Sequence, residues 1–167
     1  MATQSARRKK LHATTSSFCQ SLINPPPPEE LIQKYFTTNN PRITEHGPEW
    51  AQFRLPFLAK TFTGASGCEE YFSVLSQTLK MKMDKDAFPG PEDYIVDTEA
   101  VAGEEDANAG LKGAVSVVGK GTFQSIKTGK EWHEQFIYRF SGFDEDGKIG
   151  HWEIWADPLS AWVAVGE

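Results

Sequence analysis

Two aromatic-rich segments near the C-terminus predict an antiparallel pair of strands. Residues 131–140 read E-W-H-E-Q-F-I-Y-R-F, and residues 144–157 read D-E-D-G-K-I-G-H-W-E-I-W-A-D, which begins with a turn. Together the two segments mix Trp and Phe with carboxylates and imidazoles, which are costly to bury unless they are paired or used in chemistry. We therefore expect the functional site in this hairpin.

The length of the turn decides which side chains of the hairpin share a face. A four-residue loop (144–147) would place Glu134 opposite Asp157. A three-residue loop with a bulge would instead place Glu134 on the face of Trp152. The sequence leaves both registers open. In either one, Glu134 lies on the apolar face of its own strand, because aromatic residues stand two positions away on both sides.

The remaining patterns predict helices before the sheet and a run of strands after them. Apolar residues at helical spacing indicate one helix after the Pro run 25–28 and a second behind Ser66-x-x-Glu69, which has the form of a capping box. This order predicts an α+β domain with a cone-shaped, strongly curved antiparallel sheet and helices packed on its concave face around a pocket. We expect extended segments at 51–63, 81–88, 94–101 and 114–126, and loops at 41–50 and 104–110.

The length and charge of the chain limit the kinds of protein to which it can belong. The chain of 167 residues is long enough for one domain, which we place at 28–167, and we expect 1–27 to be disordered or loosely ordered. The first 28 residues hold four basic and no acidic residues, so the remaining 13 basic and 23 acidic residues give a charge of −10. Such an acidic body disfavours nucleic acid as a partner.

The sequence contains few features that indicate a cellular location. No apolar run reaches 18 residues, so no membrane partner is expected. The two cysteines provide neither a disulfide framework nor metal-ligand spacing, which favours a reducing compartment. We expect a cytoplasmic protein, and the basic, acid-free N-terminus leaves an organellar location as the alternative.

A family resemblance rests on short motifs in the last third of the chain. The motifs are T-G-K at 128–130, D-G-K-I at 146–149, H-W-E at 151–153, and Asp157 followed by Leu159. The chain resembles the nuclear transport factor 2-like (NTF2-like) superfamily, and within it the SnoaL-like branch of polyketide cyclases and isomerases. The ending W-A-D-P-L-S-A-W also resembles that of small fungal secondary-metabolism proteins.

The resemblance implies a function. It suggests a cofactor-independent isomerase, cyclase or dehydratase that acts by acid–base catalysis on a hydrophobic, oxygenated small molecule of secondary metabolism, in a homodimer. Ester cyclases of the branch often carry a His in the strand before T-G-K, and here the only ionisable residue of 113–126 is Lys120. This departure argues against an ester-cyclase reaction. The alternative is a non-catalytic small-molecule-binding or dimeric interaction module of the same fold.

The candidate site follows from what such chemistry needs. Glu134 is the candidate base, because a carboxylate in apolar surroundings has a raised pKa. Asp157 and Arg54 would orient or polarise a substrate oxygen, with Arg54 on the first strand of the sheet. For each of these residues a structural role, as an ion pair or a turn residue, stays open. The expected substrate-binding residues are Tyr138, Trp152, Trp155, Phe136, His133, His151 and Arg42.

A few other polar residues could contribute to a metal site or to the mouth of the pocket. Glu45 and His46 lie in the expected loop 41–50, which could cover the mouth. His133, Glu134, His151 and Glu153 form a possible metal-binding cluster, but adjacent strand residues such as His133 and Glu134 point to opposite faces. We therefore expect no metal site, and the resemblance implies that no cofactor is needed.

Overall fold

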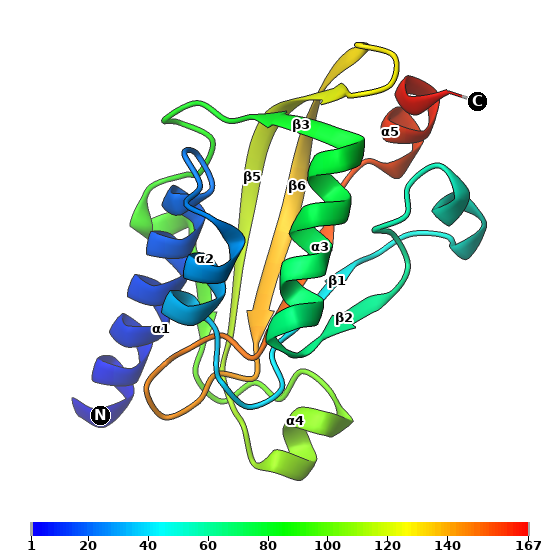
Figure 1. The fold of residues 1–167 in the computed structure, drawn as a ribbon. Coiled ribbons are helices and arrows are strands. Elements are labelled where there is room, and N and C mark those ends of the chain that lie inside the picture. Colours follow the sequence, from blue (N-terminus) through cyan, green and yellow to red (C-terminus); the bar gives the residue numbers. More distant parts are fainter. Residues whose placement is uncertain (1, 167) are drawn as a thin grey trace.

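Seven strands form one sheet within residues 2–166, the part of the chain that the computed structural model describes, with side chains from residue 4 (Figure 1). The strand order is β2-β1-β7-β6-β5-β3, and β4 pairs with the other end of β5. Neighbouring strands are antiparallel except β1 and β7, which are parallel. The strands are β1 (Arg42–Glu45), β2 (Thr61–Thr63), β3 (Leu79–Lys82), β4 (Ile95–Asp97), β5 (Ala114–Ser125), β6 (Glu131–Ser141) and β7 (His151–Trp155).

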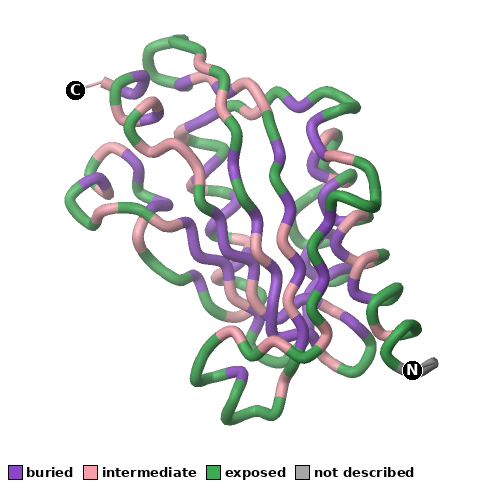
Figure 2. The backbone as a smooth tube through the Cα atoms, turned by 180° about the vertical axis from the view of Figure 1, so that it is seen from behind, coloured by how far each residue is buried: buried purple, intermediate pink, exposed green. Residues whose placement is uncertain are grey.

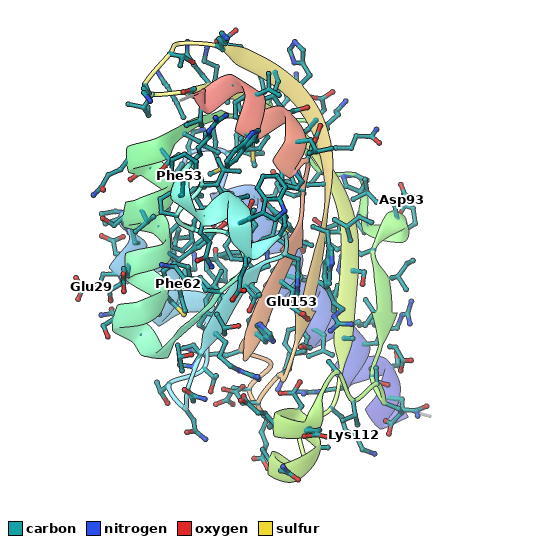
Figure 3. All side chains as sticks on the ribbon, turned by 90° about the vertical axis from the view of Figure 1, so that its right-hand side faces the viewer. Glu29, Phe53, Phe62, Asp93, Lys112 and Glu153 are labelled. Atoms are coloured by element: carbon teal, nitrogen blue, oxygen red, sulfur yellow. The ribbon has the colours of Figure 1, made fainter. Side chains whose placement is uncertain are left out.

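The helices gather on one face of this sheet. Figure 1 shows α3 in front of the long strands and α1 and α2 to their left, and Figure 3 shows β5 and β6 curving toward the side on which α3 lies. Figure 2 shows the buried residues concentrated in the strands and along the sides of the helices that face them. The predicted curved α+β architecture is confirmed. The helices are α1 (Ala2–Ser21), α2 (Pro28–Tyr35), α3 (Gly64–Thr78), α4 (Glu104–Ala109) and α5 (Pro158–Val165), with short 3-10 turns η1 (Glu49–Phe53) and η2 (Pro91–Asp93).

The pairing of β6 with β7 resolves the register that the sequence left open. Tyr138 pairs with Ile154 and Phe140 with Trp152, and the backbone N–H of Asp144 donates to the carbonyl of Lys148 at 3.1 Å. This is the register of the three-residue loop with a bulge. It places Glu134 on the concave face that also carries Trp152 and Ile154.

The N-terminal segment differs from the expectation of disorder for 1–27, because Ala2–Ser21 forms the helix α1. Leu11, Thr15 and Phe18 form a buried stripe on it at helical spacing, and the buried Leu22 continues this stripe just after the helix ends. Phe18 is fully buried and makes edge contacts with aromatic rings of α2, β6 and β7. The sequence hid this stripe because Thr15 interrupts the apolar pattern; its hydroxyl donates to the Leu11 carbonyl at 2.9 Å.

The basic residues at the start of the chain bind backbone carbonyl groups. Arg7 donates to the carbonyl oxygens of Asp144 at 2.7 Å and of Phe143 at 3.2 Å, and Arg8 donates to that of Val96 at 2.6 Å. α1 therefore ties the β6–β7 loop and β4 to the helical layer.

Three further segments correct the sequence-based assignment. The expected loop 41–50 contains β1, the expected loop 104–110 contains α4, and the expected strand 51–63 is mostly the end of η1 and turns. Pro48 precedes this stretch and Pro56 lies within it, and each fixes its φ angle and lacks an N–H donor. α3 is present, but it begins at Gly64 after Thr63 without a side-chain cap, so the predicted capping box does not form.

No helix within residues 2–166 combines the length and the apolar character needed to cross a membrane.

Truncation of Phe18 tests whether α1 belongs to the folded core. We expect Phe18→Ala to lower the free energy of unfolding by about 3–5 kcal/mol, because it leaves a cavity among packed aromatic rings. Urea denaturation followed by circular dichroism measures this. The control Gln20→Ala, on the exposed face of the same helix, should change stability by less than about 0.5 kcal/mol. An unchanged stability for Phe18→Ala would mean that α1 does not pack as described.

Candidate active site

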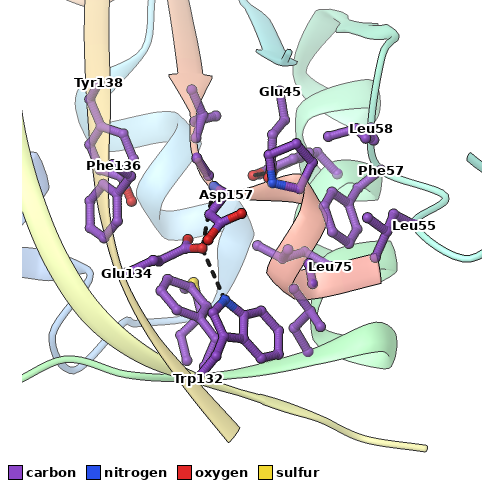
Figure 4. A pocket seen from close by; sticks show the side chains of 18 residues that line it. Glu45, Leu55, Phe57, Leu58, Leu75, Trp132, Glu134, Phe136, Tyr138 and Asp157 are labelled. Carbon is purple, nitrogen blue, oxygen red and sulfur yellow. Dashed lines mark hydrogen bonds between the residues drawn. The ribbon is translucent and has the colours of Figure 1, made fainter. Parts of the chain in front are cut away.

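A small cavity lies between the concave face of the sheet, α3, α5 and the turn that follows η1 (Figure 4). Its volume is about 30 Å³. Three carboxyl groups reach it, those of Glu45, Glu134 and Asp157, and Figure 4 shows them directed toward the same space. The apolar and aromatic side chains of the lining are Leu55, Phe57, Leu58, Tyr71, Leu75, Leu79, Met81, Phe123, Trp132, Phe136, Tyr138, Ile154, Ala156, Pro158 and Ala161.

Glu134 lies on the wall that β6 contributes. The indole N–H of Trp132 donates to Glu134 Oε2 at 3.0 Å, and the backbone N–H of Asp157 donates to the same oxygen at 3.3 Å. Burial raises the pKa of Glu134 to about 7, against the opposing effect of these two hydrogen bonds. No basic side chain is among the residues that line the cavity, so the carboxylate is stabilised there by neutral donors.

Glu45 is the second carboxyl group, and it is more deeply buried. In β1 the side chains of Ile43 and Glu45 alternate with Thr44 and point to the concave face, and Glu45 is 8% exposed. The Tyr71 hydroxyl of α3 donates to Glu45 Oε2 at 2.7 Å. Burial raises the pKa of Glu45 to about 8, and the nearby charge of Glu134 adds to the effect. Glu45 is therefore largely protonated at pH 7.

Together these groups put a base and an acid in one apolar cavity. Glu134 is close to half ionised at pH 7, whereas Glu45 retains its proton. Burial and the Glu45 charge raise the pKa of Tyr71 well above its ordinary value, so Tyr71 stays a hydrogen-bond donor. This arrangement can remove a proton from carbon and donate a hydrogen bond to an oxygen.

Asp157 lines the cavity, but its carboxylate caps α5. It accepts a hydrogen bond from the Ser160 backbone N–H at 3.0 Å and another from the Ser160 hydroxyl, and these bonds lower its pKa. The carboxylate therefore stays ionised, while its backbone N–H supports Glu134.

Arg54 lies outside the cavity, because it ends η1 instead of standing on a strand as predicted. Its guanidinium lies 3.9 Å from the centre of the Trp162 ring and donates to the Trp162 carbonyl at 3.3 Å. This placement joins η1 to α5.

The observed register between β6 and β7 places some of the expected substrate-binding residues on the concave face of the sheet and the others on the convex face. Phe136 and Tyr138 line the cavity, and Trp152 lies behind it in the core, 5.0 Å from Tyr138 between ring centres. The remaining four candidates lie on the convex face of the sheet, and none of them lines the cavity. They are Trp155, His133, His151 and Arg42.

On the convex face these side chains are bound by neighbours. The His151 ring accepts from or donates to the Thr44 hydroxyl at 2.8 Å, and burial lowers its pKa to about 4. Trp155 stacks on His46 with ring centres 4.2 Å apart. Arg42 binds Asp106 of α4 at 2.8 Å. These contacts join Trp155 to the residue after β1, His151 to β1 and Arg42 to α4.

Among the described residues, no group of three or more His, Cys, Asp or Glu side chains is arranged to hold a metal ion.

Two residues of the site were not predicted as such. Glu45 was assigned to a mouth loop, although the alternation in Arg42–Glu45 is that of a strand with Ile43 and Glu45 on one face. Tyr71 belongs to the apolar pattern behind Ser66-x-x-Glu69, which by itself indicates only a core residue of the helix. A strand interpretation of 42–45 could have found Glu45, but the contact between Tyr71 and Glu45 depends on how α3 crosses β1.

The variant Glu45→Gln tests the buried acid. In the folded protein the pKa of Glu45 is about 8, compared with an ordinary value of 4.5. The stability that this group contributes is therefore complete below pH 4.5 and is lost as the pH rises to 8, by up to about 1.4 kcal/mol per pH unit. We expect the free energy of unfolding of the wild type to fall relative to that of Glu45→Gln between pH 5 and pH 8.

Urea denaturation at both pH values measures the difference. Gln keeps an oxygen that can accept from Tyr71, so the variant should fold. The exposed Glu70→Gln serves as the control and should follow the wild type. Parallel pH profiles for the wild type and Glu45→Gln would exclude a buried, protonated Glu45.

Comparison with known proteins identifies the fold. The sequence matches no known family model and no curated protein at a significant level. The structure is similar to an NTF2-like protein of unknown function from Burkholderia pseudomallei, with a TM-score of 0.63 and 12% identity over 95% of this chain and 98% of that one.

Two other solved structures carry functional names. One is a Bacillus subtilis protein provisionally named an isomerase, with a TM-score of 0.62 and 15% identity over 95% of this chain and 94% of that one. The other is a Jannaschia protein provisionally named a SnoaL-like polyketide cyclase, with a TM-score of 0.54 and 14% identity over 92% of each chain. The chain thus has the NTF2-like cone fold that the sequence resemblance implied.

Proposed function

For this chain with the NTF2-like cone fold, we propose a cofactor-independent isomerase or cyclase that acts by proton transfer on a hydrophobic, oxygenated small molecule. The fold by itself does not decide this, because the same architecture can serve enzymes and binding proteins. The functional names of the Bacillus subtilis and Jannaschia proteins support the class of reaction. The substrate and mechanism proposed here come from the site.

The observation that carries the proposal is the pair of carboxyl groups in one apolar cavity. Burial brings the pKa of Glu134 to about 7 and that of Glu45 to about 8. A general base works best when its pKa lies near the working pH, and a carboxylic acid kept neutral can donate a hydrogen bond. Simple binding of an apolar ligand would not need two carboxyl groups in such surroundings, since each is costly to bury.

In the proposed mechanism, ionised Glu134 removes a proton from a carbon next to a substrate carbonyl. The electron pair of the broken C–H bond forms a C=C bond, and the carbonyl π electrons move to the oxygen. The neutral carboxyl of Glu45 donates a hydrogen bond to this oxygen, and Tyr71 holds Glu45 in place. Glu134 then returns its proton to another carbon of the intermediate, which completes an isomerisation. Alternatively, the intermediate attacks the carbon of a second carbonyl in the same molecule, the π electrons of that carbonyl move to its oxygen, and Glu134 gives its proton to this oxygen as the ring closes.

Hydrogen–deuterium exchange tests this chemistry without knowledge of the natural substrate. We expect the protein in D₂O to accelerate exchange of the C–H hydrogens next to the carbonyl of hydrophobic cyclic ketones such as 2-tetralone, measured by NMR. The rate should rise as Glu134 ionises near pH 7 and fall as Glu45 loses its proton near pH 8. Glu134→Gln should lower the rate at least 100-fold, because it removes the base.

The matched control is Glu131→Gln, on the same strand but exposed and paired with Lys82, which should keep wild-type exchange. Carboxyl-resolved NMR, with Glu134→Gln for assignment, should give an apparent pKa near 7 for Glu134. A pKa near the ordinary value of about 4.3, together with exchange unaffected by Glu134→Gln, would favour a non-catalytic binding module.

We also infer a homodimer that uses the convex face of the sheet. Val118, Ile137 and Trp155 pair side by side across β5, β6 and β7, and they are 51%, 46% and 39% exposed. A row of exposed apolar side chains that crosses three strands supports a buried contact with a second copy.

A charged substitution in this row tests the dimer. We expect the wild type to elute as a dimer in size-exclusion chromatography with light scattering, and Ile137→Asp to shift it to monomer. Gln135→Asp, exposed two positions away on the same strand, provides a control for added charge. A wild-type monomer at 100 µM, or a dimer unaffected by Ile137→Asp, would exclude this surface.

A further inference from the structure

The cavity at Glu134 is too small to hold an organic substrate by itself. Its volume of about 30 Å³ has room for roughly two water molecules. Pockets that enclose small organic ligands have volumes of roughly 300–1,000 Å³. A substrate that reaches Glu134 must therefore extend into neighbouring space.

An apolar groove on the other side of one cavity wall offers that space. It lies between the segment that joins α1 to α2 and the exposed side of α3, next to β3. Its volume is about 400 Å³, and Lys80 is the only ionisable residue in its lining.

Three side chains line both spaces and separate them. Leu75, Leu79 and Met81 belong to the wall of the cavity and to the wall of the groove. They stand where α3 ends and β3 begins, and Met81 is only partly buried. Leu and Met side chains change rotamer without breaking hydrogen bonds, and Met adapts its shape readily. A modest rearrangement of this partition would join groove and cavity.

Another cleft that touches Glu134 suits an apolar ligand poorly. Its lining includes the charged residues Lys82, Asp84, Asp86 and Lys120. Charged side chains hold water, and removing that water from beside an apolar group is unfavourable. The groove beside α3 is therefore the better extension for an apolar substrate.

We propose that the groove between the Pro25–Pro28 segment and α3 is a second subsite, which holds the apolar arm of an elongated substrate whose oxygenated end lies at Glu134. The proposal rests on the proposed function for the identity of that end. Pro25, Pro26 and Pro28 give the rim a fixed backbone, so the groove is formed before the ligand arrives. The size and shape of the apolar arm that can reach from the groove to the cavity are limited by the side chains of Leu75, Leu79 and Met81.

Binding of 4-alkylphenols of increasing chain length tests the subsite. Phenol, 4-butylphenol and 4-hexylphenol share one oxygenated ring and differ only in the apolar arm. In isothermal titration calorimetry we expect the dissociation constant of the wild type to fall about three- to four-fold per methylene group, as for burial of an alkyl chain. Ligand-induced NMR shifts should appear at the methyl groups of Leu22 and Ile126, in the groove, and not at Val118 of the convex face.

Two neighbouring Trp substitutions on α3 isolate the groove from the fold. Ser76 and Gln77 are both exposed, but only Ser76 lines the groove. Ser76→Trp should remove at least 10-fold of the gain between phenol and 4-hexylphenol, whereas Gln77→Trp should keep it. Equal affinity of the wild type for all three ligands, absence of binding, or an unchanged gain in Ser76→Trp would overturn the subsite.

Failure of the subsite and failure of the proposed function give different results. Glu134→Gln should weaken binding of all three phenols by a similar factor and leave the dependence on chain length intact. A chain-length gain that Ser76→Trp removes, in a protein without ketone exchange, would keep the subsite and reject the catalysis. Ketone exchange that depends on Glu134, with no chain-length gain, would keep the catalysis and reject the subsite.

Discussion

The pairing of β6 with β7 decides which side chains of the sheet face the helices. Gly147 adopts a φ of +79° in the connecting turn, and the N–H of Asp144 bonds to the Lys148 carbonyl at 3.1 Å. A shift by one residue would turn every side chain of β7 to the other face. Glu134 would then face a cavity lined by Trp155 instead of Ile154, and the packing of Trp152 against Phe18 would be lost.

Desolvation on the concave side connects the fold to the proposed chemistry. The helices that bury the aromatic core also withdraw Glu45 and Glu134 from water, which raises both pKa values. These carboxyl groups reduce stability at neutral pH, because the folded state disfavours their ionised forms. The fold tolerates them because neutral donors, Tyr71 and Trp132, bind their oxygens and the rest of the core is apolar.

The small cavity, the groove and the convex face are three consequences of one curved sheet. The concave side holds the carboxyl groups in a volume of about 30 Å³, and α3 separates this space from the groove along the Pro25–Pro28 segment. The convex side carries the row Val118, Ile137 and Trp155. A substrate and a second copy would thus approach opposite faces, so that one contact need not disturb the other.

The sequence by itself determined the α+β class, the long strands β5 and β6, and the position of Glu134 on an apolar strand face, because these follow from local periodicity. It did not determine the register between β6 and β7, because that depends on the conformation of the connecting turn. It also did not reveal the helix α1, because Thr15 interrupts the apolar pattern of its buried side. Glu45 and Arg54 show the limit most clearly. Only the crossing of α3 over β1 buries Glu45 against Tyr71, and only the packing of η1 on α5 takes Arg54 away from the cavity, because such contacts join residues far apart in the chain.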